Sequence, residues 1–180
     1  MNDTTNNLTE PQTLNDVIPP PTPVPEAKKI IVTEEDKERF FKSFLSDTPF
    51  EDTLSRLDGR LKITLRTLTV DENYDVFRQI DLDRETKRAK NEDSYLMVVV
   101  QYRLALSLVA VNGAAFCPGV TKLDSETKDG RSYVQQRIAG IQGWPVHKLA
   151  AFVDTFNSFE AKVQKLTMEI ENPDFWKAGA

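Results

Sequence analysis

The hydrophobic pattern is most continuous between Tyr95 and Val111, a run that contains neither glycine nor proline. The β-branched residues 98–100 favour a strand, but the run is much longer than the roughly 4 to 8 residues of a buried strand. It stops at Asn112-Gly113, a pair typical of a helix C-terminus. We therefore predict a central buried helix over about residues 93–112, covered by other elements on two sides.

A second pattern, with a period of two, covers residues 61–66, where apolar and polar side chains alternate. Such alternation indicates a strand with one face on the core and the other in water. Asp58-Gly59 suits a tight turn, so we predict a β-hairpin over about residues 51–67. An isolated hairpin is only marginally stable. We expect it to pack on a helix, to gain a strand from its own chain or a neighbour, or to stay mobile.

Capping boxes mark the starts of two helices, one on each side of the hairpin. The segments 33–36 (TEED) and 69–72 (TVDE) both place a hydroxyl three positions before a carboxylate. At this spacing each of the two side chains bonds the backbone N–H of the other residue. The helix that follows the second box is predicted to carry Tyr74, Phe77 and Ile80 on one face.

The clearest helical period runs from Val146 to Ile170, where apolar residues recur in steps of three and four. Pro145 suits the first turn of a helix and Asn172-Pro173 ends it, so we predict a helix over about residues 145–171. At ~1.5 Å per residue it would be roughly 40 Å long, more than a small domain needs. Part of its apolar stripe is therefore expected to face another subunit.

The domain organisation follows from these elements. A shorter helix, ended by Gly140 and Gly143, is predicted over about residues 131–141. The fold class is mainly α (α+β), a single helical domain with one β-hairpin over residues 31–180. Residues 1–30 are polar and proline-rich, and we predict a disordered or extended arm because this composition buries little apolar surface. The arm would serve as a stiff spacer, as a PxxP ligand, or as a segment that becomes ordered along a neighbouring subunit.

Aromatic side chains at both ends of the domain are candidates for partner contact. The helix after residue 33 carries three phenylalanines at helical spacing, a pattern typical of a core face and also of a docking surface. Two further aromatics follow Pro173, and they either fold back on the core or dock elsewhere. The predicted partner-binding residues are these aromatics and the prolines of the arm: Phe40, Phe41, Phe44, Phe175, Trp176, Pro20, Pro21 and Pro23.

Composition and charge narrow the classes of partner. A formal net charge of -5 and a pI near 5.0 argue against broad nucleic-acid binding, which needs a concentrated basic surface. Arg103 lies within the apolar run and argues against a membrane-spanning helix. The single cysteine, Cys117, and the lack of a secretory signal pattern at the N-terminus favour a reducing compartment.

The sequence offers little for catalysis. His147 and Cys117 are the single histidine and the single cysteine, and a zinc site needs more ligands than these two. A catalytic Cys–His dyad needs a third group that orients it, and nothing in the sequence places these two residues together. The seven glycines are scattered, so no phosphate-binding loop is present. Carboxylate pairs occur, but none lies in an apolar stretch that would raise its pKa. We predict a non-enzymatic protein without a metal or a cofactor, whose partners are proteins rather than nucleic acid or membrane.

Two adjacent segments carry a resemblance to a known family. Residues 44–53 (FLSDTPFEDT) and 57–69 (LDGRLKITLRTLT), followed by an acidic helix start, resemble the tail-assembly chaperones of tailed bacteriophages. The resemblance covers about residues 33–110 and implies a short helix, a hairpin with an RTLT exit, and a helical body. It implies a protein of the host cytoplasm that shields apolar helical segments of the tape measure, or unassembled tail-tube subunits, during phage assembly.

The proline-rich arm departs from the pattern of that family. Extended arms commonly tie small phage proteins to their neighbours in a particle. A structural component of the tail, baseplate or neck that stays in the virion, bound to neighbouring subunits or to copies of itself, is therefore the alternative hypothesis.

Overall fold

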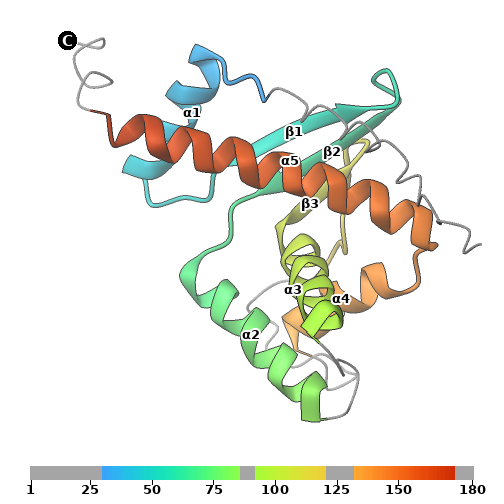
Figure 1. Cartoon of the computed structure of the whole chain (residues 1–180). Helices are drawn as coiled ribbons and strands as arrows, with labels where there is room; N and C mark the ends of the chain where they lie inside the picture. Colours follow the sequence, from blue (N-terminus) through green and yellow to red (C-terminus); the bar gives the residue numbers. More distant parts are fainter. Residues whose placement is uncertain (1–29, 86–91, 121–131, 173–180) are drawn as a thin grey trace, which may run out of the picture.

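The computed structural model describes residues 30–85, 92–120 and 132–172, without the side chains of residues 92–94. Five helices and one small antiparallel sheet make up this part of the chain, which confirms the predicted fold class (Figure 1). Residues 1–29 of the predicted N-terminal arm lie outside the described residues. In chain order the elements are α1 (Glu34–Leu45), β1 (Glu51–Arg56), β2 (Leu61–Arg66), α2 (Val70–Glu85), α3 (Glu92–Ser107), β3 (Leu108–Val111), β4 (Ala114–Ala115), α4 (Tyr133–Gln142) and α5 (Val146–Ile170).

The predicted hairpin is confirmed as β1 and β2. They pair antiparallel from Glu51 opposite Arg66 to Arg56 opposite Leu61. The turn between them uses left-handed backbone at residues 57–59, where Gly59 has a φ of 83°. Glycine adopts this conformation without a steric penalty.

The central apolar run is a helix only as far as Ser107, so the prediction of a helix to residue 112 is wrong at its C-terminal end. Residues 108–111 form β3, which pairs antiparallel with β2, and the sheet order is β1-β2-β3-β4. Asn112 and Gly113 both have positive φ and form the turn into β4 rather than a helix C-terminus. The hairpin therefore gains its third strand from its own chain.

The switch from helix to strand has a local cause. Arg137 of α4 donates from Nε to the Ala105 carbonyl at 2.9 Å and from Nη2 to the Leu108 carbonyl. These oxygens stand at the C-terminus of α3, where helix carbonyls lack partners within the helix. The residues that follow α3 pair with the edge of β2 that β1 leaves open. The Asn112 side chain also accepts a hydrogen bond from the Lys62 N–H at 2.7 Å.

Both capping boxes form as predicted. At α1, Thr33 and Asp36 exchange side-chain and backbone hydrogen bonds. At α2, the Thr69 N–H donates to Glu72 Oε2 at 3.0 Å, and the Glu72 N–H donates to Thr69 Oγ1 at 3.3 Å. Arg66 of β2 adds a bidentate ion pair to the same carboxylate, at 2.8 and 2.6 Å, which joins the strand to the helix start.

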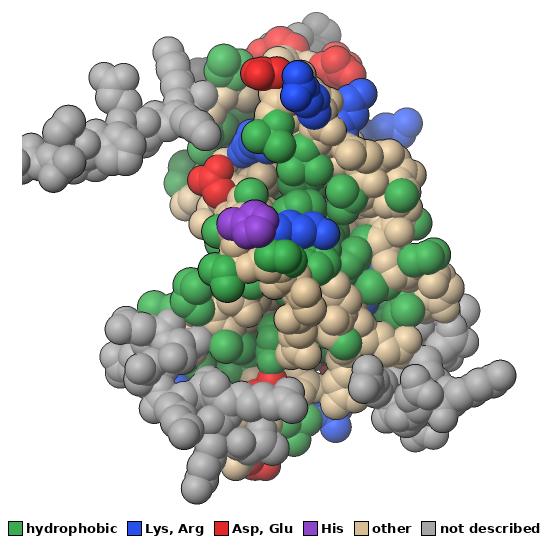
Figure 2. Space-filling view, turned by 90° about the vertical axis from the view of Figure 1, so that its right-hand side faces the viewer, with side chains coloured by type: hydrophobic (Ala, Val, Ile, Leu, Met, Phe, Trp, Pro, Cys, Tyr) green, Lys and Arg blue, Asp and Glu red, His purple; other side chains and the backbone are tan. Residues whose placement is uncertain are grey.

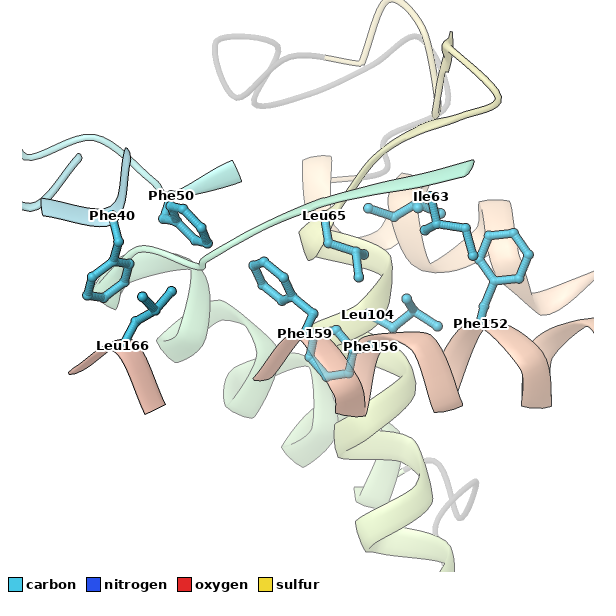
Figure 3. Close-up of a cluster of buried hydrophobic side chains, with 10 residues drawn as sticks. Phe40, Phe50, Ile63, Leu65, Leu104, Phe152, Phe156, Phe159 and Leu166 are labelled. Carbon is cyan, nitrogen blue, oxygen red and sulfur yellow. The ribbon is translucent and has the colours of Figure 1, made fainter. Parts of the chain in front are cut away.

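One core cluster lies between the sheet and α5, which runs across β1 and β2 (Figures 1 and 3). Figure 3 shows the phenylalanines of α5 directed toward Ile63 and Leu65 of β2. Phe40 of α1 and Phe50 close one end of this cluster, with ring centroids 5.2 Å apart. The helix predicted over residues 145–171 is confirmed, and the middle of its apolar stripe is buried within the chain, whereas Val146 at its start is exposed.

A second cluster joins α2, α3 and α4 below the sheet in Figure 1. It contains Val76 and Ile80 of α2, Tyr102 of α3 and Ile138 of α4. The helix predicted over residues 131–141 is confirmed, but it continues through Gly140 to Gln142. Gly140 is a site of close packing instead, because a Cβ atom there would stand 2.8 Å from Cys117 Sγ and from the Phe116 ring.

Candidate functional site

An open groove of about 450 Å³ lies between the start of α2, α3 and α5. One wall is the turn from β2 into α2 and the first two turns of that helix. The other wall comes from single side chains of α3 and α5. The lining residues are Thr67, Leu68, Thr69, Val70, Asn73, Tyr74, Phe77, Arg103, Glu160 and Val163.

Two stripes of side chains on α2 explain why this groove is open. Residues Glu72, Val76, Ile80 and Asp83 follow one another at helical spacing and are buried against the rest of the fold. Val70, Tyr74 and Phe77 repeat at the same spacing on a different face. The predicted single face of Tyr74, Phe77 and Ile80 is therefore wrong, because only Ile80 belongs to the core stripe.

The second stripe of α2 is apolar and yet accessible. Val70 is 72% exposed, Tyr74 is 70% exposed and Phe77 is 41% exposed. Single exposed apolar residues are common on proteins, whereas here three of them follow one another along one wall of a groove. The groove wall on α2 therefore presents an aromatic ridge to the solvent.

The opposite wall carries an ion pair. Arg103 of α3 donates from Nη2 to Glu160 Oε2 of α5 at 2.7 Å, and both side chains are about one-third exposed. The guanidinium also lies 5.9 Å from the centroid of the Phe156 ring, in the core below. Val163, one turn beyond Glu160, adds an apolar surface to the same wall. The two charges neutralise each other, so the groove offers mainly apolar and hydroxyl surface.

The groups that line the groove suit binding. Its lining residues hold no nucleophile paired with a base, and Tyr74, Arg103 and Glu160 are their ionisable groups. A groove with an apolar surface is typical of sites that receive an amphipathic helix. An apolar stripe along such a helix would cover Tyr74 and Phe77.

The structure separates the aromatic residues predicted to contact a partner. Phe40 is 9% exposed and belongs to the core, so this face of α1 is in part a core face. Phe41 is half-buried, and Phe44 is exposed at the end of the same helix. Five predicted contact residues lie outside the described part of the chain: Pro20, Pro21, Pro23, Phe175 and Trp176.

The single histidine and the single cysteine have different surroundings. His147 is exposed on the first turn of α5, and Figure 2 shows its imidazole at the surface. Cys117 is half-buried beside Gly140 of α4. Burial raises the pKa of the Cys117 thiol, despite the nearby positive charge of Arg137. This direction disfavours the thiolate that nucleophilic chemistry requires.

A cluster of four charged side chains outside the groove joins α1, β1 and α5. Lys162 Nζ lies 2.8 Å from Asp36 Oδ1 and 2.7 Å from Asp52 Oδ2, and Arg39 Nη2 lies 2.9 Å from an oxygen of each carboxylate. Burial alone would raise the pKa of Asp36. Hydrogen bonds from Lys162, Thr33 and Arg39 outweigh it and hold that pKa well below its usual range. Every charge in this cluster is satisfied internally, so its role is to hold the fold together.

Sequence reasoning missed the groove because its residues come from separate segments. A signal was nevertheless present, since Val70, Tyr74 and Phe77 form a second helical stripe beside Glu72, Val76 and Ile80. An apolar stripe beside the core stripe of the same helix exceeds what a single core contact needs.

Among the side chains that the structure describes, no cluster of three or more His, Cys, Asp or Glu is arranged to hold a metal ion. No helix in this part of the chain is long and apolar enough to cross a membrane. Comparison of the chain with protein-family models, with curated proteins and with solved structures finds no match.

Proposed function

We propose that this chain is a non-enzymatic protein that binds other proteins, a tail-assembly chaperone of a tailed bacteriophage. In this proposal the groove receives an apolar-faced helix of the tape measure, or a helical segment of an unassembled tail-tube subunit. The observation that carries the proposal is the exposed ridge of Val70, Tyr74 and Phe77 on the wall of an open groove.

The shape and chemistry of the groove suit such a client. An amphipathic helix that docks in a groove contributes apolar side chains at spacings of three and four residues. Tyr74 and Phe77 are one turn apart and match this repeat. The Arg103–Glu160 pair on the opposite wall can meet the polar flank of the helix. The resemblance of residues 33–110 to tail-assembly chaperones supplies the identity of the client.

The experiment is co-expression of the full chain with the tape-measure protein or the tail-tube protein of the same phage, followed by co-purification. Tyr74→Asp places a charge on the ridge, and we expect the amount of co-purified client to fall at least tenfold. Covering one large aromatic side chain is worth ~1.5–3 kcal/mol, and each ~1.4 kcal/mol corresponds to a factor of ten in affinity.

Leu57→Asp is the matched control. Leu57 is 70% exposed, as is Tyr74, but it lies at the tip of the hairpin and away from the groove. It receives the same added charge, and we expect client capture to be unchanged. Equal losses in the two variants, or no capture of either client by the unaltered chain, would refute the proposal.

A structural component of the virion is the second candidate, favoured by the proline-rich composition of residues 1–30. The two candidates differ in whether the protein remains in the finished particle. Quantitative mass spectrometry of purified particles tests this, because a chaperone is absent from mature particles and a structural component is present in stoichiometric amounts. We expect absence.

A further inference from the structure

We propose that, before a client binds, the groove is occupied by the C-terminal segment of the same chain, residues 173–180, and that the client displaces it. This inference rests on the proposed function, because it names what the client competes with. It assigns Phe175 and Trp176 a role as an internal ligand for the aromatic ridge of α2.

The position of α5 supports this assignment. Val163 lines the groove, and the described chain ends at Asn172, about two and a half helical turns farther along, or ~14 Å. Glu160, Thr167 and Glu171 are spaced at seven and four residues, so they lie along one side of the helix. The side of α5 that forms the groove wall therefore continues to the point where residues 173–180 begin.

The length and chemistry of the segment match the groove. Proline has no backbone N–H and disfavours a helical residue before it, so Pro173 in the sequence agrees with the end of α5 at Ile170. Residues 173–176 span at most ~13–14 Å when extended, enough to return toward Val163. They bring two large aromatic side chains to a groove whose other wall exposes Tyr74 and Phe77. Aromatic pairs of this kind are favourable beyond the area they bury.

The experiment measures proximity by disulfide formation in the full chain. Cys117→Ser removes the native thiol, and Asn73→Cys with Ala178→Cys places one thiol in the groove wall and one beyond the tail aromatics. Asn73 lines the groove, so the ridge of Val70, Tyr74 and Phe77 stays intact. The matched control combines Asp71→Cys with Ala178→Cys. Asp71 is exposed, two residues away on the opposite side of α2, and is absent from the groove lining.

In a glutathione redox buffer, we expect the Asn73→Cys pair to form an intramolecular disulfide with an effective concentration at least tenfold above that of the Asp71→Cys pair. Adding Phe175→Ala and Trp176→Ala should abolish this preference. Equal effective concentrations in the two pairs would overturn the proposal. So would dimers linked between chains, which would instead place a second copy of the chain on the groove.

Client capture by the same proteins separates this inference from the proposed function. Removing residues 173–180 should increase the affinity for the tape-measure protein about three- to tenfold, because a site that is mostly occupied has a correspondingly weaker apparent affinity. If the tail shows no preference for the groove while Tyr74→Asp still abolishes capture, the tail proposal fails and the chaperone proposal stands. If the tail shows the preference but no client is captured, the chaperone proposal fails.

Discussion

The two sides of α5 meet the rest of the molecule in opposite ways. On one side, Lys162 reaches Asp36 and Asp52 within 2.8 Å, and Arg39 bonds both carboxylates. On the other side, the pair formed by Glu160 with Arg103 stands at the wall of an open groove. One side is closed by charges that pair within the fold, and the other leaves an aromatic ridge uncovered.

This difference shows which side of α5 has surface free for binding. The closed side shows that the chain can seal a junction between helix and sheet with four charged side chains from three elements. The open side has charged and apolar groups of the same kinds, yet Tyr74 remains 70% exposed. The groove is thus a surface whose apolar groups no described segment covers, which is the basis of both of our proposals.

The largest expected effect comes from breaking the closed side. Lys162→Met leaves Asp36 and Asp52 close together with only Arg39 to neutralise them, and the free energy of unfolding should fall by about 3 kcal/mol. Urea titration followed by circular dichroism measures it. Lys165→Met, three residues along the same helix, removes an exposed lysine and should change stability by less than about 0.5 kcal/mol. Similar losses in both variants would show that the cluster adds nothing specific.

A smaller effect should appear in the pH dependence of the closed side. The pKa of Asp36 is lowered in the folded state, so its contribution to stability is present above the unfolded pKa of about 4 and is lost as the pH falls toward the folded value. Asp36→Asn lacks this contribution at every pH. The gap in unfolding free energy between the two proteins should therefore narrow by on the order of 1 kcal/mol between pH 5 and pH 2.

Thermal or urea unfolding across this pH range provides the measurement. Lys165→Met, which removes no carboxylate, should keep a constant gap from the unaltered protein. A constant gap for Asp36→Asn as well would mean that the carboxylate of Asp36 gains nothing from its partners.

The sequence predicted the local elements well and their boundaries less well. The hairpin, both capping boxes and α5 depend on patterns within short segments, such as the alternation at residues 61–66. The end of α3 depends on contacts between distant segments. Residues 95–111 are apolar at both helical and strand spacing, and the strand forms because β2 offers a free edge and Arg137 caps the carbonyls at the helix end.

The candidate site was less predictable than the fold. Its walls come from residues about 90 positions apart in the chain, as with Tyr74 and Val163, and no short pattern contains both. Phe40 shows the same limit on α1. A stripe of aromatic residues on this helix does not reveal which member faces Phe50 in the core. Exposure of apolar side chains is a property of the assembled tertiary structure.

The smallest expected effect on stability concerns the open side. Tyr74→Ser removes a side chain that is 70% exposed, so the unfolding free energy of the chain should change by less than about 0.5 kcal/mol, whereas we expect client capture to fall. In the double variant with Lys162→Met, the two changes in unfolding free energy should add to within about 0.5 kcal/mol. Tyr74 lies across the groove from one side of α5, Lys162 lies on the other side, and the two share no partner. Urea titration of the two single variants and the double variant measures this. A coupling well above that limit would show that the groove wall is part of the same cooperative unit as the charged cluster, and the contrast between the two sides of α5 would no longer separate folding from binding.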